Sequence, residues 1–76
     1  MLFVCRIVIE NLNKSYHRTD LETVFGQFGV ISTLNFRVGS HALLKYSVPD
    51  AAQLAIQRMN CVQLGGYCLC VSISSS

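Results

Sequence analysis

The sequence of 76 residues is long enough for one small domain, which buries only ~60% of the surface of its unfolded chain around one hydrophobic core. Hydrophobic residues make up 51% of it and charged residues 13%. An average soluble domain has about 25% charged residues, so some apolar surface is expected to stay exposed for a partner. The net charge of +2 permits an anionic partner, but it is not the charge of a strongly electrostatic nucleic-acid binder.

The apolar run from Met1 to Ile9 is predicted to be a strand with a short lead-in. Arg6 interrupts the run, which has no basic leader and no small-residue cleavage site. It is also far shorter than the ~20 residues that span a bilayer. We therefore expect no membrane partner.

The four cysteines have spacings that fit neither a disulfide framework nor a zinc site. The sequence contains no C-x2-C pair, and Cys68 and Cys70 would share one face of a strand, where they cannot easily bond to each other. We expect Cys5, Cys61, Cys68 and Cys70 to be reduced thiols of an intracellular protein, without a metal or another cofactor.

The first strand is predicted over Arg6–Asn11, where the β-branched Ile7 and Ile9 alternate with residues of the opposite face. A polar loop follows over residues 13–18. Thr19 and Glu22 then match a capping box, with Thr19 as the N-cap of a first helix. The apolar residues of that helix stand at helical spacing, and Gly29 is expected to end it: they are Leu21, Val24, Phe25 and Phe28.

Two more strands are predicted over residues 31–38 and 40–46, joined by a short turn at Gly39-Ser40. The second of them has the length of a strand in the middle of a sheet, and it lies between a turn signal and a helix-start signal. Its alternation directs Ala42, Leu44 and Tyr46 to one side and His41, Leu43 and Lys45 to the other. In the first, Leu34 and Phe36 are assigned to the core, and Thr33, Asn35 and Arg37 to the opposite side.

A second helix is predicted to begin at Ser47 as N-cap, with Pro49 in its first turn, and to end at Asn60-Cys61. Asp50 suits the positive end of the helix, and the residues of its buried side are Ala51, Ala52, Ala55, Ile56 and Met59. In a last strand after Leu64-Gly65-Gly66, the core residues are Leu69, Val71 and Ile73, and the outward residues are Cys68, Cys70 and Ser72. The tail Ser74-Ser75-Ser76 is expected to fray.

The predicted order β-α-β-β-α-β is that of a ferredoxin-like α+β fold, with four antiparallel strands and both helices on one side. We expect a single domain over residues 1–76, with a core from about residue 5 to residue 74. Two helices cover only one face of such a sheet. The other face is therefore where function is expected.

Two stretches of this predicted sheet resemble the RNA recognition motif. Residues 7–12 (IVIENL) are similar to the shorter box of that family, and residues 39–46 (GSHALLKY) to its longer box, K/R-G-F/Y-G/A-F-V-x-F/Y. Residues 59–71 (MNCVQLGGYCLCV) are similar to its helix end, turn and fourth strand. The resemblance spans roughly residues 5–74 and implies a module that binds single-stranded RNA across the open sheet face.

The sequence departs from the family where aromatic rings stack on bases. Val8, His41 and Leu43 stand at the three aromatic positions, and Tyr46 points into the core. A base stacked on a ring is worth ~1–3 kcal/mol, so weak or unusual RNA binding is expected. The runs RIVIENL and ALLKY are similar to repeats of the polypyrimidine-tract-binding family, a resemblance that implies pyrimidine-rich RNA on an aliphatic sheet face.

The expected RNA-binding residues are those that alternate toward the open face. Arg37 and Lys45 suit phosphates, Asn35 and Ser72 suit base edges, and His41 either stacks on a base or is an ordinary surface histidine. Cys68 is also outward, and Tyr16 and Tyr67 either extend the platform or serve packing alone. The full predicted set is Arg6, Val8, Glu10, Asn35, Arg37, His41, Leu43, Lys45, Cys70 and Ser72.

No catalytic arrangement is recognisable in the sequence, so an enzyme is not expected. His17 and His41 have no acid placed for a triad, and there is no glycine-rich phosphate loop. The prediction is an RNA-binding module of a larger RNA-processing protein, located in the nucleus or the cytoplasm. The alternative is a module of the same fold that docks a protein, or a second copy of itself, through its apolar sheet face or its helices.

Overall fold

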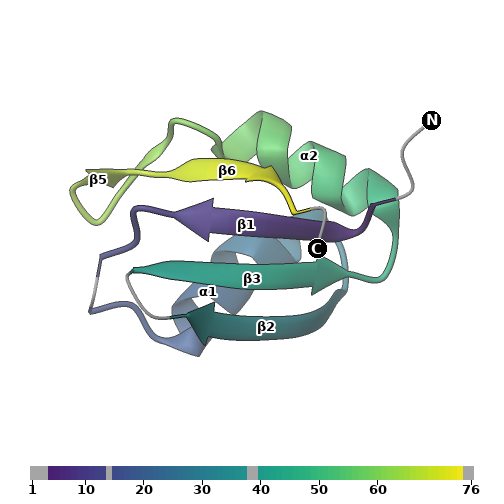
Figure 1. Ribbon diagram of the computed structural model, residues 1–76, viewed down its shortest axis with the longest axis horizontal. Helices are drawn as coiled ribbons and strands as arrows, with labels where there is room; N and C mark the ends of the chain where they lie inside the picture. The colour runs from purple at the N-terminus through teal and green to yellow at the C-terminus, as the bar shows by residue number, and fades with distance from the viewer. Residues whose placement is uncertain (1–3, 14, 38–39, 75–76) are drawn as a thin grey trace.

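Antiparallel strands form the main sheet of the computed structural model, which describes residues 4–13, 15–37 and 40–74 (Figure 1). Within these residues the sheet has the strand order β2-β3-β1-β6. Its strands are β1 (Arg6–Glu10), β2 (Ile31–Arg37), β3 (His41–Tyr46) and β6 (Cys70–Ile73). As predicted, the strand that contains Ala42, Leu44 and Tyr46 lies inside the sheet, where it pairs with β2 and β1.

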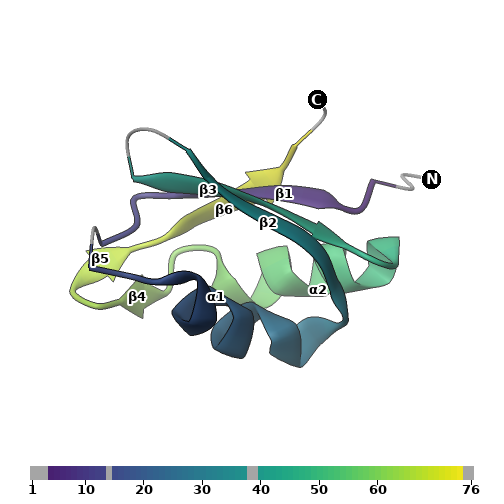
Figure 2. The same cartoon turned by 90° about the horizontal axis from the view of Figure 1, so that it is seen from below.

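Both α-helices lie against the same face of this sheet, as Figure 2 shows. They are α1 (Arg18–Phe25), which continues into the 3-10 turn η1 (Gly26–Phe28), and α2 (Pro49–Met59). The predicted β-α-β-β-α-β order is confirmed. The described residues place no helix on the opposite face, which we call the open face.

The last predicted strand is divided, because a small hairpin precedes β6. Its strands are β4 (Gln63–Leu64) and β5 (Tyr67–Cys68), and Gly65 and Gly66 between them have φ of 61° and 85°. Positive φ at both turn residues is typical of a type I′ hairpin turn, which glycine adopts readily. Leu69 lies between β5 and β6, and it is buried as predicted.

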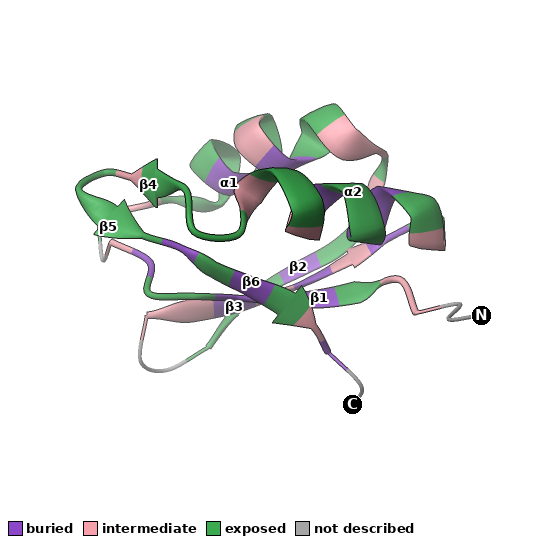
Figure 3. Cartoon of the chain, turned by 90° about the horizontal axis from the view of Figure 1, so that it is seen from above, coloured by how far each residue is buried: buried purple, intermediate pink, exposed green. Residues whose placement is uncertain are grey.

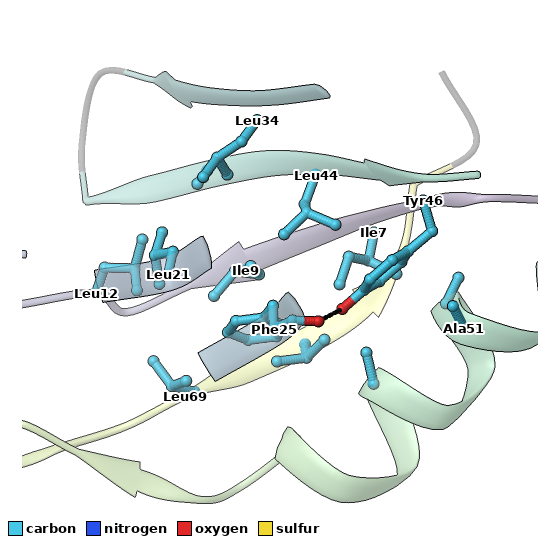
Figure 4. Close-up of a cluster of buried hydrophobic side chains, with 14 residues drawn as sticks. Ile7, Ile9, Leu12, Leu21, Phe25, Leu34, Leu44, Tyr46, Ala51 and Leu69 are labelled. Atoms are coloured by element: carbon cyan, nitrogen blue, oxygen red, sulfur yellow. Dashed lines mark hydrogen bonds between the residues drawn. The ribbon is translucent and has the colours of Figure 1, made fainter. Parts of the chain in front are cut away.

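The hydrophobic core fills the space between the sheet and the helices (Figures 3 and 4). Ile9 pairs with Ala42 and Val71, and Leu44 pairs with Ile7 and Leu34, so inward side chains of neighbouring strands meet in rows. The Tyr46 hydroxyl donates a hydrogen bond of 2.6 Å to the Phe25 carbonyl oxygen. The buried hydrophobic residues are Ile7, Ile9, Leu12, Leu21, Phe25, Leu34, Ala42, Leu44, Tyr46, Ala51, Ala52, Ala55, Leu69 and Val71.

The predicted helix starts are wrong by one or two residues. The N-cap of α1 is His17, whose backbone N–H donates to Asp20 Oδ2 at 2.8 Å, so Asp20 rather than Glu22 closes the first turn. The aspartate is three residues from the cap, where its short side chain reaches back to the free backbone N–H. The N-cap of α2 is Val48 rather than Ser47. The Ser47 N–H instead donates to the Val30 carbonyl, which ties the two connections at this end of the sheet.

The end of the first helix also differs from the prediction. The α-helix ends at Phe25, and Phe28 lies in η1, half-buried, with its ring edge-on to that of Phe25 at 6.3 Å between centroids. Gly29 therefore follows a 3-10 turn rather than an α-helix. The predicted end of the second helix at Asn60 is confirmed.

Two side chains lie in surroundings that differ from the predicted ones. Phe36 was expected in the core, but it is 43% exposed, because β2 is an edge strand and Phe36 stands near its end. Ser74 was expected to fray, but it is 8% exposed and its N–H donates to the Arg6 carbonyl oxygen. The predicted turn residue Gly39, Val38 of the predicted strand, and Ser75 and Ser76 of the tail lie outside the described residues.

Substitution of Gly29 is expected to destabilise the protein, because a side chain at this position has no room beside α2. A Cβ added there would lie 2.5 Å from the Cβ of Ala51, far inside contact distance. Gly29→Ala should therefore lower the free energy of unfolding by about 1–3 kcal/mol, as overpacking does. Gly26→Ala is the matched control, since a Cβ at Gly26 meets nothing within 4 Å and its φ is −68°. Urea denaturation of both variants checks this, and equal midpoints would contradict it.

Tyr46→Phe tests the hydrogen bond that joins β3 to the end of α1. The variant leaves the Phe25 carbonyl without this donor, so the free energy of unfolding should fall by about 1–3 kcal/mol at neutral pH. Burial raises the pKa of the Tyr46 phenol above its ordinary value of about 10. The stabilisation that the protonated Tyr46 phenol gives the wild type is complete below pH ~10 and is lost as pH rises through the raised pKa. The difference in free energy of unfolding between the wild type and Tyr46→Phe should therefore become smaller at alkaline pH. Equal free energies of unfolding of the two proteins at pH 7 would show that this hydrogen bond does not stabilise the fold.

Candidate functional site

The outward side chains of the sheet form cross-strand rows on the open face. In the central row, Asn35 pairs with Leu43, Leu43 with Val8, and Val8 with Ser72. Val8 and Leu43 are half-buried, and they lie opposite each other on the two inner strands. The middle of the open face is therefore an aliphatic pair flanked by an amide and a hydroxyl.

A second row carries positive charge. Lys45 pairs with Arg6 on one side and with Thr33 on the other. Ser74 continues the row, since its N–H donates to the Arg6 carbonyl. Two cationic side chains thus lie side by side on β1 and β3, on the face that the helices do not cover.

The remaining predicted residues lie at the other end of the open face. Arg37 pairs with His41 across β2 and β3, and Glu10 pairs with Cys70 across β1 and β6. Glu10 and Cys70 are exposed, and His41 is half-buried. Cys68 was predicted to face outward on the open face, but this prediction is wrong, because Cys68 lies in β5, outside the main sheet.

A hollow of about 480 Å³ on the open face joins these rows into one candidate site. Among the described residues that line it, the charged ones are all cationic and none is a carboxylate. It brings together five of the ten predicted residues, Arg6, Asn35, Arg37, Leu43 and Lys45, together with Thr33, Leu44 and Ser74. Val8, Glu10, His41, Cys70 and Ser72 lie on the same face outside its lining.

Thr33, Leu44 and Ser74 are the lining residues that the sequence-based set missed, and Leu44 is a buried core residue, as predicted. Thr33 had been assigned to the open side of its strand, so its alternation with Leu34 was the available signal. Ser74 follows Ile73 with the same alternation, but it was assigned to a frayed tail. Its place in the site depends on the backbone hydrogen bond to Arg6.

A second hollow, of about 190 Å³, lies where β2 ends and β3 begins, beside the segment that follows β1. Two aromatic residues line it, whereas the strand residues described on the open face include no phenylalanine or tyrosine, and Arg37 lines both hollows. Its lining residues are Leu12, Asn13, Tyr16, Phe36, Arg37, Ser40 and His41. Tyr67 lines neither hollow and is 47% exposed in β5.

Cysteine, histidine and carboxylate side chains do not gather into a metal site in the part of the chain that the structure describes. All four cysteines are unbonded. Among the described helices, none has the length and hydropathy needed to cross a bilayer.

Comparison with known proteins places this chain among modules of one family. The family model described as RNA recognition motif matches residues 7–69. The human poly(U)-binding-splicing factor PUF60 is 30% identical over 73 residues, which cover 87% of this chain and 13% of that protein. The chain thus spans a small part of the length of the curated relatives it matches.

Solved structures agree with this fold over nearly the whole chain. The structure of the Nab3 RRM, which is described as giving insight into cis element recognition of non-polyadenylated RNAs, superposes with a TM-score of 0.86 at 26% identity, and the match covers 95% of this chain and 96% of that one. The third RRM of Pes4 superposes with a TM-score of 0.91 at 24% identity and covers 95% and 93%, which shows the shared fold.

Proposed function

Because this chain belongs to the RNA recognition motif family, we propose that it is a single-stranded RNA-binding module of a larger RNA-processing protein. It contacts a few nucleotides through the open face of its sheet. The observation that carries the proposal is the hollow on that face, whose charged lining residues, Arg6, Arg37 and Lys45, are all cationic.

The cationic side chains are suited to the phosphates of an extended strand. Arg6 and Lys45 are neighbours on β1 and β3, and Arg37 lies on β2 at the other end of the hollow. Phosphate contacts fix the position of a strand without reading its bases. Glu10, the acidic residue of the predicted set, lies outside the lining of the hollow and does not oppose them there.

The central row is suited to small bases. Val8 and Leu43 offer aliphatic contact, and Asn35 and Ser72 at the two ends of the row offer hydrogen bonds to base edges. An amide group both donates and accepts, as the edge of uracil requires. The similarity to poly(U)-binding splicing factors supports a preference for pyrimidine-rich RNA.

The platform is expected to bind weakly by itself because it lacks phenylalanine and tyrosine. Each ring stacked on a base would add ~1–3 kcal/mol, and the central row supplies none. A second module on the same chain raises affinity through effective concentration. We therefore assign this module to a multi-domain protein that handles RNA in the nucleus or the cytoplasm.

Arg37→Ala combined with Lys45→Ala tests the phosphate contacts. The double variant should bind oligo-U more weakly at low salt. Each lost contact should also reduce the slope of log affinity against log salt by ~0.7, so the slope falls by about 1.4. Fluorescence anisotropy titrations at several salt concentrations measure both effects.

The matched control removes the same charge from the helices. Arg18 and Arg58 are exposed and lie in α1 and α2, so Arg18→Ala with Arg58→Ala should leave the salt slope close to that of the wild type. Equal losses in the two double variants would show that net charge rather than the open face binds RNA.

Leu43→Phe tests whether the missing ring limits affinity. Leu43 is half-buried in the middle of the open face, so a phenyl group there would lie among the bases. The affinity for oligo-U should rise roughly 5-fold or more, as one added base stack predicts. Val62→Phe, at an exposed site between α2 and β4, is the control and should bind as the wild type does. A Leu43→Phe variant that binds no better would argue against base contact at this position.

A protein-binding module is the second candidate, and exposed apolar side chains near α2 favour it. Val30 is 73% exposed and Val48 is 51% exposed. The hydrogen bond from the Ser47 N–H to the Val30 carbonyl joins the η1–β2 connection to the β3–α2 connection, in which these two valines lie. Leu54 on α2 is 37% exposed. Binding through this surface would change little with salt, whereas RNA binding weakens as salt rises.

A further inference from the structure

We propose that the smaller hollow, between Tyr16 and Phe36, binds one further nucleobase of the RNA strand, beyond the edge of the sheet face. This inference rests on the proposed function and extends it. The ligand is a single base held by stacking on aromatic rings, beyond the central row of the open face and next to the Arg37–His41 pair.

The hollow is formed where the segment after β1 meets the start of β3. The Leu12 N–H donates to the Ser40 carbonyl at 2.9 Å, which joins the two segments. Figure 1 shows that both lie at the same end of the sheet, where the arrow of β1 ends and β3 begins. Phe36, near the end of β2, completes the lining from the edge strand.

The two rings line a hollow that shares Arg37 with the hollow of the open face. Phe36 is 43% exposed and does not belong to the core cluster, and Tyr16 is half-buried. Both rings therefore have surface that a ligand can reach. Every base presents a flat face that stacks on such rings. A solvent-accessible pair of rings beside a ring-poor sheet therefore supplies the contact that the sheet face lacks.

Tyr16 is held in place before any ligand binds. Its hydroxyl lies against Gly65, where a Cβ would come within 2.5 Å of it. Asn13 fixes the same corner, since its Nδ2 donates to the Gly65 carbonyl at 3.1 Å and its Oδ1 accepts from Ser15 N and Oγ at 2.9 Å. A ring that is already ordered costs little entropy when it binds a base.

Arg37 connects the two hollows, because it lines both of them. A strand that leaves the open face along β2 would pass this guanidinium, with His41 directly opposite on β3. Within the described ranges, no carboxylate lines either hollow, so the path from one to the other suits a polyanion better than an acidic peptide.

The size and polarity of the hollow indicate how it would recognise its ligand. Its 190 Å³ is below the ~300–1,000 Å³ of sites that enclose drug-sized molecules, so it suits one ring rather than a whole nucleotide. The amide of Asn13 is already committed to Gly65 and Ser15. Stacking rather than hydrogen bonding would hold the base, so this position should tolerate different bases.

The test compares Phe36→Leu with the wild type on oligo-U strands of increasing length. Strands that only span the open face should bind both proteins equally. Longer strands should bind the wild type more tightly, and Phe36→Leu should lose roughly 5- to 150-fold for these, which is one base stack. Oligo-C of the same lengths should show the same loss, and NMR signals of the Phe36 ring should move only with the longer strands.

Tyr67→Leu is the matched control, because it removes an exposed ring that lines neither hollow. It should bind all lengths as the wild type does, and an equal loss in this variant would overturn the assignment. If the wild type binds RNA and Phe36→Leu binds every length equally well, the pocket is refuted while the proposed function stands. If the wild type binds no oligonucleotide, both fail. Phe36 ring signals of the wild type that stay unmoved by long strands would also exclude the pocket, and this measurement does not depend on how well Phe36→Leu folds.

Discussion

The alternation of β1 and β3 is the constraint on which the rest of the structure depends. Ile7, Ile9, Leu44 and Tyr46 are fully or almost fully buried against the helices, and the Tyr46 hydroxyl bonds to the Phe25 carbonyl at 2.6 Å. Because successive side chains point to opposite faces, burying these residues directs the others outward. The residues of the open face are thus a geometric consequence of the core. A shift of the strand register by one residue would turn the core side chains toward the open face and the outward side chains toward the helices.

The open face that results differs from a platform of aromatic rings. Its centre is the aliphatic pair Val8 and Leu43, and its charge lies at the ends, with Arg6 and Lys45 in one row and Arg37 in the other. Under the proposed function, such a surface would rely on phosphate contacts and on small bases, so its affinity for RNA would depend on salt and on neighbouring modules. This is consistent with a module that covers 13% of the length of a related splicing factor.

The aromatic rings that this face lacks lie instead at its edge. Tyr16 and Phe36 line a hollow that shares Arg37 with the larger one. The edge strand exposes Phe36, and the type I′ turn brings Gly65 against Tyr16. A strand of RNA that contacts both hollows would be read weakly on the sheet and held by stacking beyond it.

The sequence by itself determined the order of the main helices and strands, the inward and outward sides of the four strands of the main sheet and five residues of the larger hollow, since these follow from periods of two and of about 3.6 residues. Only the tertiary structure decided which apolar residues are covered. Phe36 has the alternation of a core residue, but its strand lies at the edge of the sheet. Ser74 joins the site through a backbone bond to Arg6, and Asp20 caps α1 in place of Glu22. Such outcomes depend on neighbours distant in the chain or on competition between adjacent hydrogen-bonding groups, which a local pattern does not contain.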